Sequence, residues 1–107
     1  MTRMLSTCEG FEWDEGNSDK NLHLHDVTDS ECEQVFFNLP LLVAADVKHS
    51  QREPRYYALG RTDDDRWLFI AFTVRNKRLR IISARDMNDR ELKKYANRIE
   101  SDTSFQQ

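Results

Sequence analysis

The sequence of 107 residues lacks the features that mark membrane, secreted or disulfide-rich proteins. No apolar run approaches the roughly 20 residues that a membrane span requires. The start, MTRMLSTCEG, has no apolar segment of the kind found in signal peptides. The two cysteines, Cys8 and Cys32, show neither metal-ligand spacing nor a disulfide framework. We therefore expect a cytoplasmic protein without a membrane contact, in which both cysteines are free thiols.

Glycine is also scarce, and the motifs built on it are absent. The three glycines form no phosphate-binding loop, and there is no serine-centred elbow or Cys–His nucleophile signature. His23 and His25 are two positions apart and do not share a helix face, which disfavours a metal pair. The sequence thus predicts neither a metal ion nor a cofactor.

Positive charge is scarce in the first half of the chain and outnumbers negative charge in the second. Residues 1–53 contain only four Lys/Arg against eleven Asp/Glu, whereas residues 54–107 contain twelve Lys/Arg against eight Asp/Glu. This split indicates a basic surface on one part of a mildly acidic protein. The length fits one domain, residues 1–107, with a core over about 11–99 and flexible termini.

Two capping boxes predict the start of two helices, one at Thr28–Glu31 and one at Asn88–Glu91. Pro40 ends the first helix. A poorer helix over 15–25, capped by Asp14, and a short strand over 11–13 are expected before them. The apolar stripes at i, i+3, i+4 and i+7 are Cys32, Val35, Phe36 and Leu39 in the first helix, and Leu92, Tyr95, Ala96 and Ile99 in the second.

Four strands are expected between these helices, with a tight hairpin at 75–77. They cover residues 41–46, 55–62, 66–74 and 78–85. The polar residues 101–107 are expected to form a tail. The resulting order, β-α-α-β-β-β-β-α, predicts an α+β fold in which helices pack against an antiparallel sheet.

The last strand is unusually rich in arginine. In a regular strand Arg78 and Arg80 share one face, and Arg85 lies on the other unless the strand bulges. Singly, each arginine fits a solvated sheet face or a carboxylate pair. Together with the aromatic residues of the sheet, they fit contact with RNA, because guanidinium groups bind phosphates bidentately and stack on bases.

Two histidines have neighbours that matter for chemistry. His25 shares a helix face with Asn21, so it is either part of a buried polar pair or a site residue. His49 lies in the polar loop KHSQREPR, close to Glu53 and Arg55. Loops often carry function, but an exposed loop histidine without a role is the commoner case.

Several stretches of the chain, in this order, resemble the BrnT toxin family. They are FEWDEGNSDKN, His25 with Val27, ECEQVFFNLPLLV, HSQREPRYYALGRT and RLRIISARDMNDRELKKY. The resemblance runs from about Phe11 to Tyr95. It implies a ribonuclease toxin of a bacterial type II toxin–antitoxin system, with a fold similar to RelE-type toxins, that inhibits translation.

The resemblance also implies a partner and a set of motif positions. The partner is an antitoxin of the BrnA type, which dimerises and binds DNA through a ribbon-helix-helix, and we expect a heterotetramer. The motif positions are His25, His49, Glu53, Arg55, Arg61, Arg80, Ser83 and Arg85.

The hypothesis from these positions is a metal-independent cleavage of RNA. The ribose 2′-hydroxyl would attack its own phosphate and leave a cyclic phosphate and a free 5′-hydroxyl. Arg61, Arg80 and Arg85 would stabilise the phosphate. Glu53, His25 or His49 would move the protons, histidine more readily near neutrality because ordinary pKa values are roughly 6.5 for His and 4.3 for Glu.

The chain departs from the family at two positions. Family members commonly have Lys-His-Gly where this chain has Leu24-His25-Asp26. The missing lysine removes a cation from the RNA site, and Asp26 replaces a glycine suited to the end of a helix. These changes leave an alternative open, a non-catalytic module that only pairs with its antitoxin.

Overall fold

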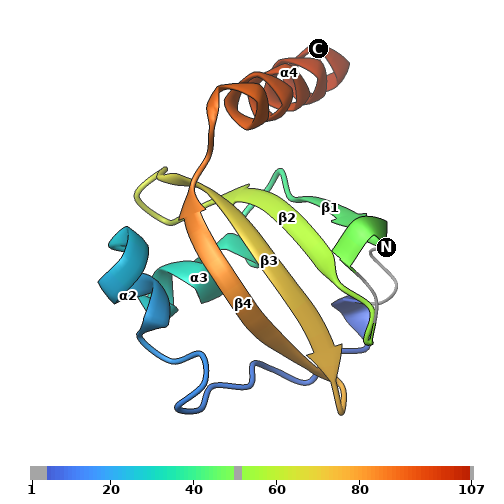
Figure 1. Cartoon of the computed structure of the whole chain (residues 1–107). Coiled ribbons are helices and arrows are strands. Elements are labelled where there is room, and N and C mark those ends of the chain that lie inside the picture. Colours follow the sequence, from blue (N-terminus) through green and yellow to red (C-terminus); the bar gives the residue numbers. More distant parts are fainter. Residues whose placement is uncertain (1–4, 50–51, 107) are drawn as a thin grey trace.

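The computed structural model describes residues 5–49 and 52–106, and its framework is one antiparallel sheet. The strands follow one another as a meander in the order β1-β2-β3-β4 (Figure 1). Their bounds are Leu42–Ala45 for β1, Tyr56–Arg61 for β2, Trp67–Arg75 for β3 and Arg78–Asp86 for β4, with a 3-10 helix, η1, at Val47–His49. The predicted sheet is confirmed.

Helices cover both faces of this sheet. They are α2 (Lys20–His25), α3 (Asp29–Val35) and α4 (Asp89–Gln106). Figure 1 shows α2 beside β4, α3 behind the sheet and α4 across one end of it. Val35 of α3 is buried in the main core with Ile70 and Phe72, whereas Tyr95 of α4 is buried in a second core with Leu59. The predicted α+β class is confirmed.

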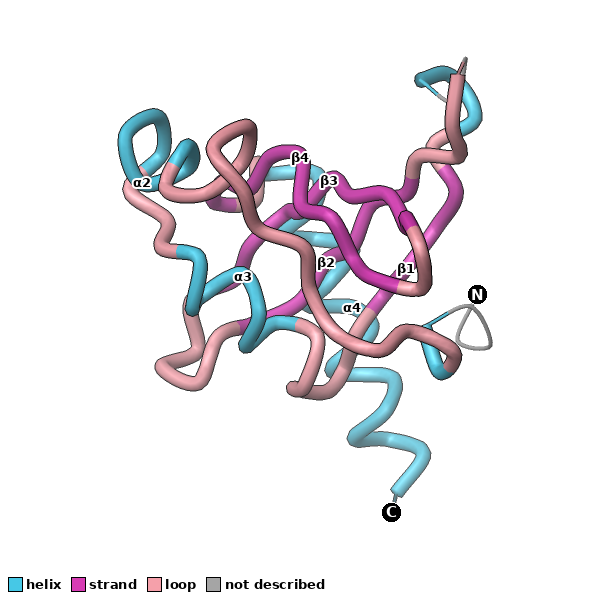
Figure 2. The backbone as a smooth tube through the Cα atoms, turned by 90° about the horizontal axis from the view of Figure 1, so that it is seen from below, coloured by secondary structure: helices cyan, strands magenta, loops and turns pink. Residues whose placement is uncertain are grey.

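The N-terminal segment runs along the outer edge of β4 on its way to α2 (Figure 2). Phe11 forms a single parallel bridge with Leu79, so the strand expected over 11–13 is reduced to one contact. The flexible N-terminus expected before residue 11 is wrong for residues 5–10, because hydrogen bonds tie this segment to the β3–β4 hairpin. The Glu9 amide donates to the Lys77 carbonyl, and the Gly10 carbonyl accepts from the Leu79 amide. Residues 1–4 lie outside the described residues.

A bulge in β4 decides which arginines share a face. Ala71 pairs with Ser83 but Phe72 pairs with Ile81, so Ile82 is the extra residue. The bulge reverses the alternation, and Arg80 therefore lies on the same face as Arg85. The strand is thus not regular, and the exception stated for a bulge applies.

The helix predicted before the two capping boxes starts later than its sequence pattern suggests. Asp14 does not cap a helix, because its carboxylate accepts the Gly16 amide in a turn and the helix α2 begins only at Lys20. Asp26 ends α2 in the left-handed conformation, with φ 57°, and its amide donates to the Leu22 carbonyl. Asp26 thus serves as the helix end for which glycine is better suited.

The helix predicted from Thr28, α3, has the expected start and ends earlier than predicted. Thr28 and Glu31 form the capping box, which is confirmed. Because α3 ends at Val35, Leu39 does not join the apolar stripe and is 75% exposed. Phe37 lies off the stripe, as predicted, and is 79% exposed.

The last helix, α4, also begins at its predicted capping box, where Asn88 and Glu91 exchange hydrogen bonds. It continues to Gln106, so the polar tail expected from residue 101 is wrong for residues 101–106, because these residues extend the helix. Tyr95 is buried and its hydroxyl donates to the Pro40 carbonyl at 2.6 Å. Leu92 is exposed, contrary to the predicted stripe, because only one narrow side of α4 meets the sheet.

Both cysteines are free thiols. Burial raises the pKa of the Cys32 thiol to about 12 and also raises the pKa of Cys8. Within the described ranges, no helix is long and apolar enough to cross a bilayer.

Arg66 joins the turn between β2 and β3 to both α3 and β4. Its guanidinium donates to Asp86 at 2.7 Å and contacts Glu31 at 3.3 Å. The hydrogen bond from Arg66 holds the pKa of the Asp86 carboxyl below its usual range. Burial raises the pKa of Glu31, but hydrogen bonds from Thr28 and Arg66 outweigh it and the pKa is lowered.

Because of these lowered pKa values, the free energy of unfolding decreases at acidic pH. Both carboxylates stabilise the folded chain above about pH 4.5, and this contribution is lost as the pH falls through their folded-state pKa values. We expect Arg66→Met to lower the melting temperature at pH 7 and to reduce the further loss between about pH 5 and pH 2. Arg78→Met, at an exposed arginine of the β3–β4 hairpin, is the control. Parallel melting-temperature curves for wild type and Arg66→Met would contradict this account.

Candidate active site

One face of the sheet carries the arginines of β4. Arg80, Ser83 and Arg85 lie on it, and their cross-strand partners on the same face are Thr73, Ala71 and Phe69 of β3. Tyr57 of β2, the partner of Ala71, lies on the same face. We call this surface, made of Tyr57, Arg80, Ser83 and Arg85, the arginine face. The core under α4 covers only the end of the sheet near Leu59 and Trp67.

Arg80 is held by carboxylates from the N-terminal segment. Its Nη1 atom lies 2.8 Å from Glu12 Oε1 and 2.8 Å from Asp14 Oδ2, and its Nη2 atom donates to Asp14 Oδ1 at 3.0 Å. The Arg80 side chain is only 14% exposed, whereas Asp14 is 56% exposed. A phosphate would therefore reach Arg80 by competing with an exposed aspartate.

Glu53 lies at the same end of the sheet. Arg75 donates two hydrogen bonds to it, from Nη2 at 2.8 Å and from Nε at 3.0 Å. This bidentate contact lowers the pKa of the Glu53 carboxyl, and the positive charges of Arg55 and Arg80 lower it further. Glu53 therefore stays ionised near neutral pH and is better suited to holding arginines than to exchanging protons.

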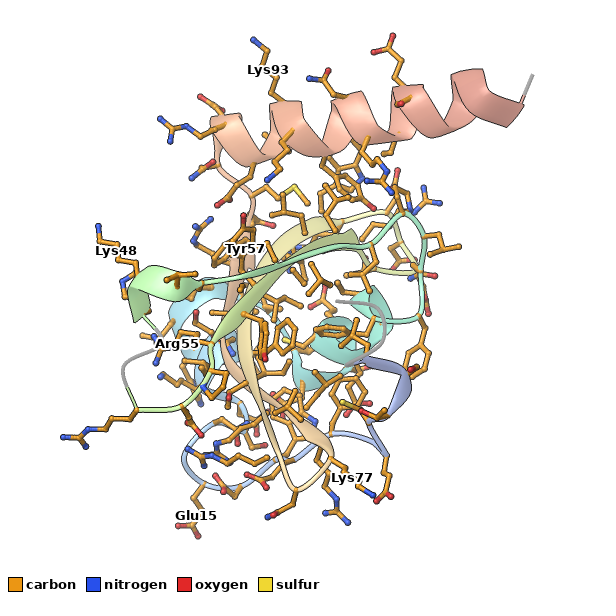
Figure 3. All side chains as sticks on the ribbon, turned by 90° about the vertical axis from the view of Figure 1, so that its right-hand side faces the viewer. Glu15, Lys48, Arg55, Tyr57, Lys77 and Lys93 are labelled. Atoms are coloured by element: carbon orange, nitrogen blue, oxygen red, sulfur yellow. The ribbon has the colours of Figure 1, made fainter. Side chains whose placement is uncertain are left out.

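A hollow of about 370 Å³ lies beside this cluster, in the segment between β1 and β2. Its described lining residues are Lys48, His49, Arg52, Glu53 and Arg55, and we call it the basic hollow. Figure 3 shows Lys48 and Arg55 projecting to the same side of the molecule. Cations outnumber the single carboxylate, so the basic hollow can attract a phosphate.

His49 has the geometry of an oriented proton shuttle. Its Nδ1 atom lies 2.9 Å from Asp46 Oδ2, and its side chain is 57% exposed. A carboxylate on one ring nitrogen fixes the ring orientation and leaves the other nitrogen for a substrate. Of the candidate proton carriers, His49 and Glu53 are brought together in the basic hollow.

Arg85 belongs to a different part of the arginine face. Its guanidinium lies 4.2 Å from the centre of the Phe69 ring and makes a bidentate contact with Glu91 of α4. The Phe69 ring stacks on Tyr57 with centroids 5.8 Å apart, and Lys94 lies over Tyr57. Aromatic rings flanked by cations form a platform on which nucleic-acid bases can stack.

Arg61 and His25 do not join this group. Arg61 pairs with Trp67 and Arg80 pairs with Thr73, so the two arginines are separated by six residues, roughly 20 Å, along β3. Arg61 contacts Asp65 at 3.7 Å instead. His25 is exposed at the end of α2, where its backbone carbonyl accepts from Arg66. These two residues lie too far away to bind the same phosphate as Arg80.

Sequence reasoning missed residues that the structure adds to the site. Arg75 holds Glu53, and Glu12 and Asp14 occupy Arg80, but these contacts join distant parts of the chain. Lys48 and Arg52 had a local signal, since both lie in or beside the same polar loop as His49. Among residues 5–49 and 52–106, no group of three His, Cys, Asp or Glu side chains is arranged to hold a metal ion.

Comparison with known families gives one match. The family described as the ribonuclease toxin BrnT of type II toxin–antitoxin systems matches residues 13–91, which is well over half of the chain. This range includes α2, α3, all four strands and the basic hollow. No curated protein matches the chain.

Proposed function

The chain belongs to the BrnT family of ribonuclease toxins of type II toxin–antitoxin systems, and we propose that it cleaves RNA without a metal ion in the basic hollow. The observation that carries this proposal is the meeting of His49 and Glu53 among the cations Lys48, Arg52 and Arg55. Arg80 lies close enough to Glu53 to lower the pKa of that carboxyl. Cations stabilise the developing phosphate charge, and the histidine moves the proton.

The proposed reaction starts from the ribose itself. His49 takes the proton of the 2′-hydroxyl, whose oxygen attacks the adjacent phosphorus. The bond to the 5′-oxygen breaks, and this oxygen takes up a proton to leave a 5′-hydroxyl beside a 2′,3′-cyclic phosphate. Asp46 holds the His49 ring at 2.9 Å, and the Arg75–Glu53 pair fixes the position of the carboxylate beside it.

The other members of the predicted site take different roles in this proposal. Arg80 binds the scissile phosphate or the next one along the chain, and Arg85 flanks the Tyr57–Phe69 platform that receives a base. Arg61 and His25 are left outside the reaction. The target is a single-stranded RNA, because only unstacked bases can lie on such a platform.

The biological setting follows the family. We propose a cytoplasmic toxin, related in fold to RelE-type toxins, whose RNA cleavage inhibits translation. Its antitoxin is of the BrnA type, with a ribbon-helix-helix that binds DNA, and the complex is a heterotetramer.

A second candidate is a non-catalytic module that only pairs with its antitoxin. Two observations favour it: Glu12 and Asp14 already neutralise Arg80, and Leu24 stands where the family commonly has lysine. If Arg80 serves only to hold the N-terminal segment, RNA has no access to it. The two functions therefore differ in the wild-type chain, which cleaves RNA only in the first, and an Arg80 variant tests whether that cleavage depends on this residue.

We expect Arg80→Ala to reduce RNA cleavage by about a hundred-fold or more, the effect of losing one preorganised charge from a transition state. Its contacts are with partly exposed carboxylates, so the melting temperature should fall by only a few degrees. The measurement pairs calorimetry with cleavage of a defined RNA by the same preparations. Arg78→Ala, on the same strand but exposed, is the matched control. Normal cleavage by Arg80→Ala would remove this residue from the catalytic site, whereas absence of cleavage by the wild-type chain would favour the non-catalytic module.

A further inference from the structure

A groove of about 730 Å³ runs along the outer edge of β1, between this strand and α4. β1 is an edge strand, paired with β2 alone (Figure 1). Leu41 and Val43 line the groove and also pack toward the α3 core, whereas Leu42 lines it and packs toward the α4 core. Since side chains from both faces line it, the groove lies along the strand edge itself.

Among the described residues, β2 is the only strand paired with β1. In the described part of the chain, no backbone group outside β2 bonds to Leu42–Ala45. An edge strand of this kind presents unpaired amides and carbonyls, which can accept an added strand. The groove therefore suits an extended segment of a protein.

The side chains around the groove indicate the chemistry of that segment. Leu39 lies in it and is 75% exposed. The other apolar lining residues come from β1 and its approach, from Leu5 of the N-terminal segment and from Tyr57 of β2. α4 contributes two cations, Lys94 and Arg98, and the described lining includes no Asp or Glu. An apolar segment flanked by acidic residues complements this combination.

We infer that this groove, the β1 groove, is where the antitoxin docks, by adding an extended, apolar and acid-flanked segment beside β1. The family supplies the class of partner, since a type II toxin has an antitoxin partner. A strand can pair with the β1 backbone, whereas RNA cannot, and the lining is largely apolar. The docked segment also explains why Leu39 is left uncovered in the isolated chain.

Docking in the β1 groove would also affect the arginine face. Tyr57 lines the groove and also forms part of the Tyr57–Phe69 platform. Lys94 lines the groove and lies over the Tyr57 ring of that platform. A segment in the groove therefore covers one side of the platform and blocks RNA. This blocking rests on the function proposed above, whereas docking itself does not.

The test uses the full chain and the purified product of the reading frame that adjoins its gene, with binding measured by calorimetry in the absence of RNA. Leu39→Asp should weaken binding at least ten-fold. Phe37→Asp, an equally apolar and exposed position outside the groove, should bind like wild type. In wild type, hydrogen exchange should show new protection of the β1 amides, Leu42–Ala45, in the complex.

Several results would overturn the docking site. They are the absence of binding to wild type, equal binding by Leu39→Asp, or protection confined to elements other than β1. Protection of the β1 amides by a single-stranded RNA oligonucleotide instead would assign the groove to RNA. Because binding is measured without RNA, a catalytically inactive chain that docks normally would refute only the proposed ribonuclease activity. Melting curves of both variants confirm that they are folded.

Discussion

His49→Ala is expected to lower the rate of RNA cleavage by about 10²–10⁴-fold, the usual contribution of a positioned general acid or base. His49 lies in the basic hollow with Glu53, and Asp46 orients its ring. No other described histidine has this setting, since His25 and His23 are exposed on α2. The measurement is a single-turnover cleavage assay on a defined RNA over about pH 5 to 8.

The matched control is His25→Ala, which removes an exposed histidine of the family pattern from the other end of the molecule. It should cleave at the wild-type rate, and both variants should melt like wild type because both side chains are exposed. A large loss with His25→Ala and none with His49→Ala would move the chemistry to α2.

Val35→Asp is expected to unfold the domain. Val35 is fully buried between α3 and the sheet, and its Cγ1 lies 2.6 Å from the position that a Cβ on Gly60 would occupy. An unpaired charge at this site costs several kcal/mol, comparable with the roughly 5–15 kcal/mol that stabilise a whole domain. Thermal unfolding followed by circular dichroism measures the effect.

Phe37→Asp introduces the same charge two residues later, at a side chain that is 79% exposed. It should lower the melting temperature far less, through loss of the ring contact with Phe11 at 6.3 Å. Equal losses in the two variants would show that the burial of Val35 and the exposure of Phe37 are assigned wrongly.

The elements that sequence predicts well are those fixed by neighbouring residues. Both capping boxes need only residues three positions apart, and Thr28–Glu31 and Asn88–Glu91 start their helices as expected. The β3–β4 hairpin likewise depends on Asn76 and Lys77, which both adopt the left-handed conformation. These features are local and need no knowledge of the fold.

The position of the bulge in β4 could not be predicted, because the side chains that contact the strand there come from residues far along the chain. On the outer edge of β4, the Asn17 amide donates to the Ile81 carbonyl at 3.0 Å. The Asn21 carbonyl accepts from the Ala84 amide at 2.9 Å. These contacts surround Ile82 and replace a neighbouring strand. Only the assembled fold places Arg80 and Arg85 on one face.

The same reason limits prediction of the site. The loop sequence brings His49, Glu53 and Arg55 close together, and the structure places them around one hollow. Pairing of Arg80 with Glu12 and Asp14 joins residues more than 60 positions apart. The separation of Arg61 from Arg80 follows from strand register, which the residues of one strand do not reveal.

The central claim is that this chain cleaves RNA by attack of the 2′-hydroxyl without a metal ion. Its most direct test is mass spectrometry of the products that the purified chain forms from a defined single-stranded RNA in excess EDTA. The account predicts undiminished cleavage, with a 2′,3′-cyclic phosphate on one product and a 5′-hydroxyl on the other. Cleavage that EDTA abolishes and a divalent ion restores, or products with a 3′-hydroxyl and a 5′-phosphate, would contradict it.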